Sequence, residues 1–274
     1  MSRFSTLLLK EYWENQKTLL WMPVALTLAI WLLSALFISN GTVSIHISGN
    51  VQAPRLPVMP FLALPFFLCA GLAAITYCGN CFVEERRDRS IVFWRSLPVS
   101  DIETVAAKAA TALVLLPVIS YLAGLLAQLP VAILLTHLGN MTWPEVLATM
   151  AQQGEHFIWL SILMAPYSGA MMLLSVLTNR PLLWMLVGPI VIFIGESLLL
   201  NGHPVSQLLF GQMTKEILMV LGSLIGQPML GQGANWVTSG ALLSTTWSMI
   251  SGLAMAAIFW GLCAEVRRRR LIKD

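Results

Sequence analysis

The chain has 274 residues, of which 57% are hydrophobic and 11% are charged, and its formal net charge is +3. Soluble domains carry about 25% charged residues, so the composition excludes an ordinary soluble protein and predicts an all-α integral membrane protein. At about 20 residues for each crossing, the length fits about six transmembrane helices in a single domain over residues 1–274, with little room for a separate catalytic domain.

The first stretch, residues 1–17, predicts a helix that lies in the membrane interface. Apolar side chains such as Leu7 and Trp13 alternate with charged ones such as Lys10, which is typical of a helix at the boundary between lipid and water. The first span follows at 18–39. It is too long for the core of a typical signal peptide, so we expect it to be retained.

Residues 40–55 are rich in Ser, Gly and Asn and show no helical period, which predicts an outer loop. The second span, 56–77, contains Pro60 and Pro65. Proline cannot donate a backbone hydrogen bond inside a helix, so we expect these residues to kink the span.

Residues 82–100 form the one long charged stretch between apolar blocks. Glu85 and Arg89 stand four residues apart with the acid first, which is the favourable order for a helical ion pair. Residues 84–94 therefore predict a short charged helix on the membrane face.

The third span begins just after this stretch. Ser100 and Glu103 match the capping box of a helix start, so a helix is predicted over 101–136. This is longer than the bilayer requires, so the helix must protrude or tilt, and Pro117 is expected to bend it. Lys108 lies in its first turns, and we expect its amine to reach the lipid headgroups by snorkelling.

An outer loop precedes the next two spans, which are shorter. This loop, residues 139–156, carries acidic but no basic side chains and is predicted to hold a short amphipathic helix after Pro144. The fourth span, 157–177, places small residues such as Gly169 at four-residue intervals, which allows helices to approach closely. The fifth span is predicted at 182–200.

Glu196 is the only acid well inside a predicted span. An intramembrane carboxylate is a candidate for substrate binding or gating. Glu196 also stands near the outer end of its span, where it could be an interfacial acid that reaches water or Lys215, and both interpretations stay open.

The last part of the chain combines an irregular segment with a strong packing pattern. Residues 201–238 are apolar but broken by glycines, which predicts helical pieces that dip into the outer leaflet. The sixth span, 239–262, carries small residues at an unbroken four-residue interval, which predicts a helix-packing face. These residues are Gly240, Ser244, Ser248, Gly252 and Ala256. A basic tail at 263–274 follows.

Charge fixes the predicted orientation. Of the sixteen Lys and Arg residues, this arrangement of spans leaves only Arg55 and Lys215 outside, so fourteen of the sixteen lie on the inner side. By the positive-inside rule both termini and the 82–100 loop are cytoplasmic.

The charged stretch also carries a family resemblance. The motifs Glu85–Ser90 and Phe93–Asp101, followed by Lys108, resemble the cytoplasmic loop of type-2 ABC exporter permeases. The resemblance is close over residues 81–108 and extends to the rest of the chain only in the spacing of spans. It implies six spans with both termini cytoplasmic, a coupling helix between spans two and three, and re-entrant helices between spans five and six.

The resemblance implies a partner. In that family the loop docks on a separate ATPase subunit, and two permease chains, identical or closely related, work with two such subunits. The residues expected to make this contact are Glu84, Glu85, Arg86, Arg87, Asp88, Arg89, Phe93, Trp94 and Arg95.

The expected function is therefore that of a transmembrane permease subunit of an ABC exporter in a bacterial inner membrane. The chain has no G-x-x-x-x-G-K-[ST] phosphate loop, so ATP and Mg²⁺ are expected in the partner subunit, with no cofactor in this chain. No enzymatic activity of its own and no nucleic-acid partner are expected. Substrates of the resembled family include drugs, peptides, lipids and polysaccharides, and the sequence does not choose among them.

Two alternatives belong to other classes. One is a membrane anchor or sensor that uses the same ATPase without transport. The other is an intramembrane protease of the CAAX type, because Glu84, Glu85 and Arg89 match its E-E-x-x-x-R motif and His46 and Asn50 resemble a further motif. The predicted topology places these two elements on opposite sides of the membrane, which argues against the protease.

Cys78 and Cys81 have the C-x-x-C spacing of redox and metal sites. No second pair and no nearby His accompany them, so we interpret them as small buried hydrophobes and keep metal or redox chemistry as the alternative. The histidines fall in separate predicted outer segments without the spacing of a metal site. They are His46, His137, His156 and His203.

Overall fold

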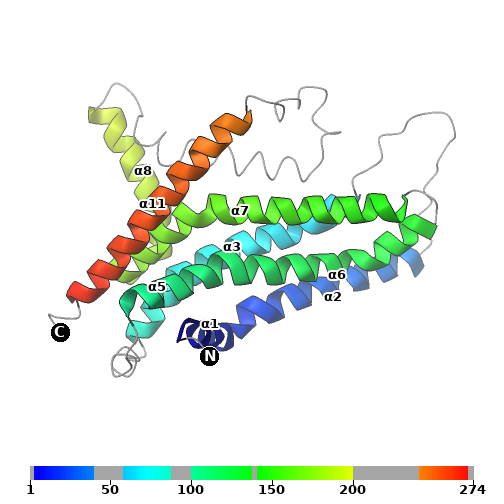
Figure 1. Ribbon diagram of the computed structural model, residues 1–274, viewed down its shortest axis with the longest axis horizontal. Coiled ribbons are helices and arrows are strands. Elements are labelled where there is room, and N and C mark those ends of the chain that lie inside the picture. The colour runs from blue at the N-terminus through cyan, green and yellow to red at the C-terminus, as the bar shows by residue number, and fades with distance from the viewer. Residues whose placement is uncertain (1–2, 40–57, 88–99, 138–140, 200–240, 271–274) are drawn as a thin grey trace.

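A computed structural model describes residues 3–39, 58–87, 100–137, 141–199 and 241–270, without the side chains of 3, 37–39, 58, 241–248 and 270. Every element in these ranges is a helix (Figure 1). The elements are α1 (Arg3–Glu14), η1 (Lys17–Trp21), α2 (Met22–Ser39), α3 (Val58–Arg87), α5 (Asp101–Ala110), η2 (Thr111–Leu115), α6 (Leu116–His137), α7 (Trp143–Leu177), α8 (Pro181–Leu199) and α11 (Ala241–Arg270).

Six helical runs in the described residues are long and apolar enough to cross a membrane. They are 17–36, 59–87, 101–137, 143–177, 181–199 and 249–269. The prediction of a helical multi-pass membrane protein is therefore confirmed. A separate coupling helix is not confirmed. Residues 84–87 form the end of α3, and residues 88–99 lie outside the described residues, so that part stays a prediction. The predicted re-entrant segment, 201–238, also lies outside them.

Helix α7 corrects one prediction. It runs without interruption for 35 residues from Trp143 to Leu177, so the separate outer-loop helix predicted after Pro144 is wrong. Thr142 and Glu145 form a capping box at its start, and a proline in the first turn suits a helix because its missing N–H has no intrahelical partner there. Nothing in the sequence after this start breaks the helix before the fourth predicted span.

Two π-turns each precede a proline. In η1 the N–H of Met22 donates to the carbonyl of Lys17, and in η2 the N–H of Leu116 donates to that of Thr111. Pro23 and Pro117 follow directly. A proline ring clashes with the carbonyl four residues earlier, and a widened turn relieves the clash. The irregularity expected at Pro117 is thus a π-turn.

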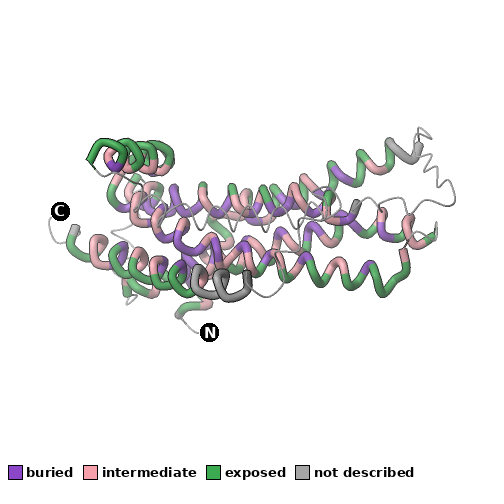
Figure 2. Tube along the Cα trace, turned by 90° about the horizontal axis from the view of Figure 1, so that it is seen from above, coloured by how far each residue is buried: buried purple, intermediate pink, exposed green. Residues whose placement is uncertain are grey.

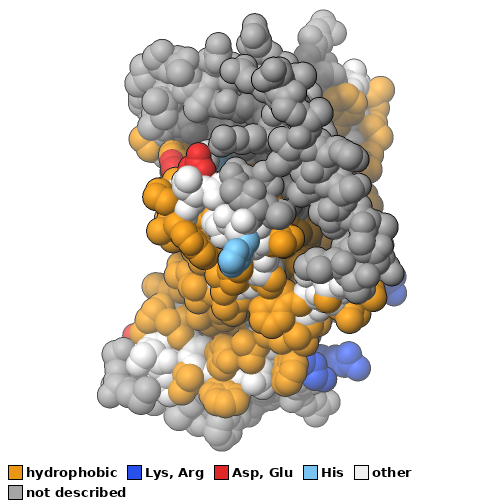
Figure 3. Space-filling view, turned by 90° about the vertical axis from the view of Figure 1, so that its right-hand side faces the viewer, with side chains coloured by type: hydrophobic (Ala, Val, Ile, Leu, Met, Phe, Trp, Pro, Cys, Tyr) orange, Lys and Arg blue, Asp and Glu red, His pale blue; other side chains and the backbone are white. Residues whose placement is uncertain are grey.

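The long helices form a bundle with α3, α6 and α7 at its centre. Helix α3 packs against α6 and α7, α2 lies along α6, and α11 crosses α7. In Figure 1, α2 and α7 lie on opposite sides of this bundle, and α8 and α11 leave it on the α7 side. Buried residues follow the middle of the long helices (Figure 2). Apolar side chains cover much of the described surface at the end opposite the chain termini (Figure 3).

Polar side chains fix the register of α2, α6 and α7. The amides of Gln128 and Gln153 are buried and donate to each other at 2.9 and 3.1 Å. The hydroxyl of Thr27 donates to the carbonyl of Ala123 at 3.2 Å. Interhelical hydrogen bonds of this kind hold helices together where hydrophobic burial in lipid cannot.

Close packing of α7 on α11 occurs at Gly169. A Cβ atom there would stand 3.0 Å from Cβ of Phe259 and 3.3 Å from the carbonyl oxygen of Ala256. In the predicted small-residue face of α11, Gly252 and Ala256 are buried, as expected. Gly240 lies outside the described residues, and the side chains of Ser244 and Ser248 are not described.

Candidate functional site

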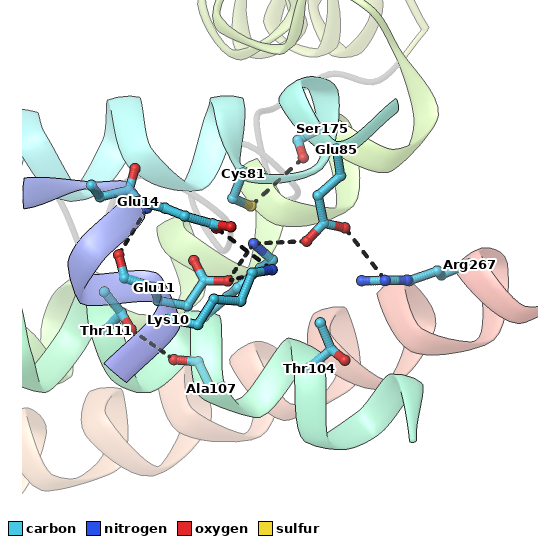
Figure 4. A network of polar contacts seen from close by, with 12 residues as sticks. Lys10, Glu11, Glu14, Cys81, Glu85, Thr104, Ala107, Thr111, Ser175 and Arg267 are labelled. Carbon is cyan, nitrogen blue, oxygen red and sulfur yellow. Dashed lines mark hydrogen bonds and ion pairs between the residues drawn. The ribbon is translucent and has the colours of Figure 1, made fainter. Parts of the chain in front are cut away.

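Five charged side chains meet at the end of the bundle where α1 lies (Figure 1), and we call them the charged cluster. Figure 4 labels three of them, Glu11, Glu85 and Arg267. Its members come from α1, α3, α5 and α11. They are Glu11, Glu85, Asp101, Lys108 and Arg267. The cluster joins helices that are far apart in the sequence, because Glu11 and Lys108 are separated by 97 positions.

Lys108 is the centre of the charged cluster. Its side chain is only 3% exposed, and its Nζ lies 2.8 Å from Oε1 of Glu11 and 3.1 Å from Oε1 of Glu85. A buried ammonium is tolerated when carboxylates pair with it and accept its hydrogen bonds. The prediction that Lys108 snorkels to the headgroups is therefore wrong. Its position on α5 faces α1 and α3, so the amine finds protein carboxylates before it reaches lipid.

Glu11 is held on both of its oxygens. Oε1 accepts from Lys108, and Oε2 accepts from the hydroxyl of Tyr77 at 2.6 Å. Burial alone would raise the pKa of Glu11, but the Lys108 charge, these two hydrogen bonds and the charge of Lys10 together lower the pKa below its usual value. Within the predicted 1–17 stretch, α1 is a helix whose buried face carries a carboxylate that pairs inside the protein; its place at the membrane interface stays a prediction.

Arg267 links both helices that flank residues 88–99. Its Nε lies 3.0 Å from Oδ1 of Asp101 at the start of α5, and a terminal guanidinium nitrogen lies 3.4 Å from Oε2 of Glu85 near the end of α3. Lys108 and Arg267 also stand 5.4 and 5.1 Å from the ring centroid of Phe82, within the range of cation–π attraction. One residue of α11 therefore ties the two ends of the charged loop together.

Arg86 fastens the end of α3 to the end of α7. Its guanidinium donates to the carbonyls of Ser175, Val176 and Thr178 at 2.5, 2.6 and 2.8 Å. The last carbonyls of a helix have no intrahelical partner, so this arginine satisfies them.

The residues expected to contact an ATPase thus fall into three groups. Glu84 and Arg87 are exposed. Glu85 and Arg86 point into the bundle, where they bind Lys108 and the α7 carbonyls. The others lie outside the described residues and stay predictions. They are Asp88, Arg89, Phe93, Trp94 and Arg95.

Three members of the charged cluster were not anticipated from the sequence: Glu11, Asp101 and Arg267. One signal was available for Glu11, which follows Leu7 by four residues and so shares the apolar face of its helix. Arg267 stands in a run of four arginines, and nothing in that run distinguishes it from its neighbours.

The remaining candidates lie elsewhere. Glu196 is 6% exposed on α8, so it is buried rather than open to water, and its predicted reach to Lys215 lies outside the described residues. Cys78 and Cys81 are free and buried, as expected for small buried hydrophobes, and Cys263 is a third buried free thiol. Within the described ranges, no group of three or more His, Cys, Asp or Glu side chains is placed to hold a metal ion.

Comparisons with models of protein families, with curated proteins and with solved structures found no match to this chain. The fold and the site describe a helical membrane protein with six candidate spans and a buried charged cluster at one end.

Proposed function

We propose that the chain is the permease subunit of an ABC exporter and that a separate ATPase subunit binds its charged loop at residues 82–100. The observation that carries the proposal is the attachment of this loop. Its flanking helices are joined through Glu85 and Asp101 to Arg267, and through Glu85 to Lys108 and α1. A force applied to the loop would therefore reach α1, α3, α5 and α11 together.

The energy source in this proposal is external. The sequence lacks the phosphate-loop motif, so ATP and Mg²⁺ bind to the partner. Closure of two ATPase subunits on ATP would move the two permease chains seated on them, provided that the contacts differ between the open and closed states. In the proposed topology, both termini and the charged loop face the cytoplasm of a bacterial cell, as the positive-inside rule predicts.

Exposed residues make the contact in this arrangement. Glu84 and Arg87 are exposed near the start of the loop, and Trp94 further along it is one of the residues expected from the resemblance to dock on the ATPase. Glu85 and Arg86 transmit the movement rather than meet the partner, because their side chains are engaged inside the bundle.

Co-purification tests the proposal. The full chain is expressed with an ATPase subunit encoded in a neighbouring reading frame, and the complex is isolated through a tag on the permease. Arg87→Glu and Trp94→Ala should each abolish recovery of the ATPase. The matched controls Arg55→Glu and Trp143→Ala, at the predicted outer side, should retain it. Equal recovery with all four variants, or no association with the unmodified chain, would contradict the proposal.

A further inference from the structure

The outer half of α7 carries polar side chains along one face. Glu145, Gln152 and Glu155 are exposed and stand seven and then three residues apart, so they share a side of the helix. Trp159 continues this side and donates to Oε1 of Glu155 at 3.2 Å. Thr149, between the first two, donates to the carbonyl of Glu145 at 2.8 Å. We call these five residues the polar face of α7.

Hydrogen bonds show which residues of α6 lie at the same height. The pairing of Gln128 with Gln153 places these two residues side by side, and α6 and α7 run in opposite directions (Figure 1). Glu155 follows Gln153 by two residues, and Leu126 precedes Gln128 by two. Each residue advances about 1.5 Å along a helix, so Glu155 and Leu126 lie within about one turn of each other in height.

Apolar side chains are exposed at this height on the other side of the bundle. Leu126 is 52% exposed on α6. Its carbonyl accepts from Nε1 of Trp31 on α2 at 3.2 Å, and nearby Leu28 and Leu32 are 57% and 64% exposed. Exposed leucines on two candidate spans suit a surface that faces lipid. If this surface faces lipid, the height shared by Leu126 and Glu155 lies within the hydrocarbon region.

The polar face of α7 cannot share that lipid environment. Carboxylates and amides in contact with hydrocarbon are costly, and in membrane proteins they face protein or a water-filled cavity. Helix α7 lies across the bundle from α2, on the side where α8 and α11 diverge (Figure 1). With lipid against the leucine side, the α7 side would meet protein or water at the same membrane depth.

We propose that the polar face of α7 lines a water-filled passage that opens at the end of the bundle opposite the charged cluster. If the chain is the proposed exporter subunit, the hydrophilic part of the substrate moves along this face. The water contact itself does not depend on an ATPase partner.

Cysteine reactivity in lipid nanodiscs tests the proposal without assuming an orientation, because both membrane faces are open to reagent. The purified full chain carries Cys69→Ala, and the other native thiols, Cys78, Cys81 and Cys263, are buried. A charged, membrane-impermeant maleimide is then applied to single variants Gln152→Cys and Glu155→Cys, with Leu126→Cys and Leu28→Cys as controls at the same height.

The two α7 positions should react at least about tenfold faster than the two leucine positions, because the thiolate forms in water and not in lipid. Fast reaction at all four positions would place this height outside the bilayer and overturn the proposal. Slow reaction at all four would show that lipid or a second copy covers the polar face, which also overturns it. Size-exclusion profiles confirm that each variant is folded. Neither failure affects the co-purification test, which reports on the charged loop at the other end.

Discussion

Lys108 keeps its charge inside the bundle because two carboxylates from different helices hold it. Replacing it with Gln leaves Glu11 and Glu85 without their shared cation. Removing one partner of a buried ion pair costs about 3 to 5 kcal/mol, so Lys108→Gln should lower the free energy of unfolding by an amount of that order.

Thermal unfolding in nanodiscs measures this effect. Arg180→Gln, which removes an exposed cation, is the control and should change little. Equal melting temperatures for Lys108→Gln and Arg180→Gln would show that the cluster does not stabilise the fold.

Glu11 makes the stability of α1 depend on pH. Its pKa is lowered in the fold, because Lys108 and its hydrogen bonds outweigh the effect of burial. A group with a lowered folded pKa contributes its full stability above the unfolded pKa, about 4.3 for Glu, and loses it as the pH falls through the folded value. The unmodified chain should therefore exceed Glu11→Gln in stability at pH 7, and this difference should shrink below about pH 4. A difference that stays constant from pH 7 to pH 3 would contradict the pairing.

At the scale of helices, the contact of α7 with α11 depends on the absence of a side chain at Gly169. Gly169→Ala places a Cβ atom 3.0 Å from Cβ of Phe259 and 3.3 Å from a backbone carbonyl. Overpacking of this kind costs about 1 to 3 kcal/mol. The control Gly188→Ala on α8 meets nothing within 4 Å, and alanine favours a helix by up to about 1 kcal/mol over glycine. Opposite shifts in melting temperature are expected, and two equal shifts would disprove the close contact.

Composition and span length predicted the helical fold, because a crossing helix needs a continuous apolar run that is visible in the sequence. The capping box of Ser100 and Glu103 was also predictable, because its two residues stand only three positions apart in the sequence. The continuity of α7 was missed because the polar residues between Glu145 and His156 resemble a loop when helix packing is unknown.

The charged cluster could not be derived from spacing. The bond between Lys108 and Glu11 depends on how α1 packs against α5, and a periodic pattern carries no information on such packing. Snorkelling was the expectation for Lys108 because a lysine near a helix end usually reaches the headgroups. The docked α1 helix puts a carboxylate closer than the lipid surface.

At the scale of the whole molecule, Arg267 should relay movement from the loop to α11. Arg267→Gln removes the ion pairs to Glu85 and Asp101 but leaves the exposed residues Glu84 and Arg87 in place. The ATPase should therefore still co-purify. Hydrogen exchange in α11 should change on addition of a non-hydrolysable ATP analogue in the unmodified complex and not in the variant. The same response in both complexes would exclude Arg267 as the link.

If a separate ATPase works through the charged loop of this chain, its rate of ATP hydrolysis in nanodiscs must depend on the chain. The rate of the reconstituted complex should differ from that of the isolated ATPase, and Arg87→Glu should abolish this difference while Arg55→Glu should preserve it. A rate that is the same with and without this chain would show that the ATPase does not work through the loop.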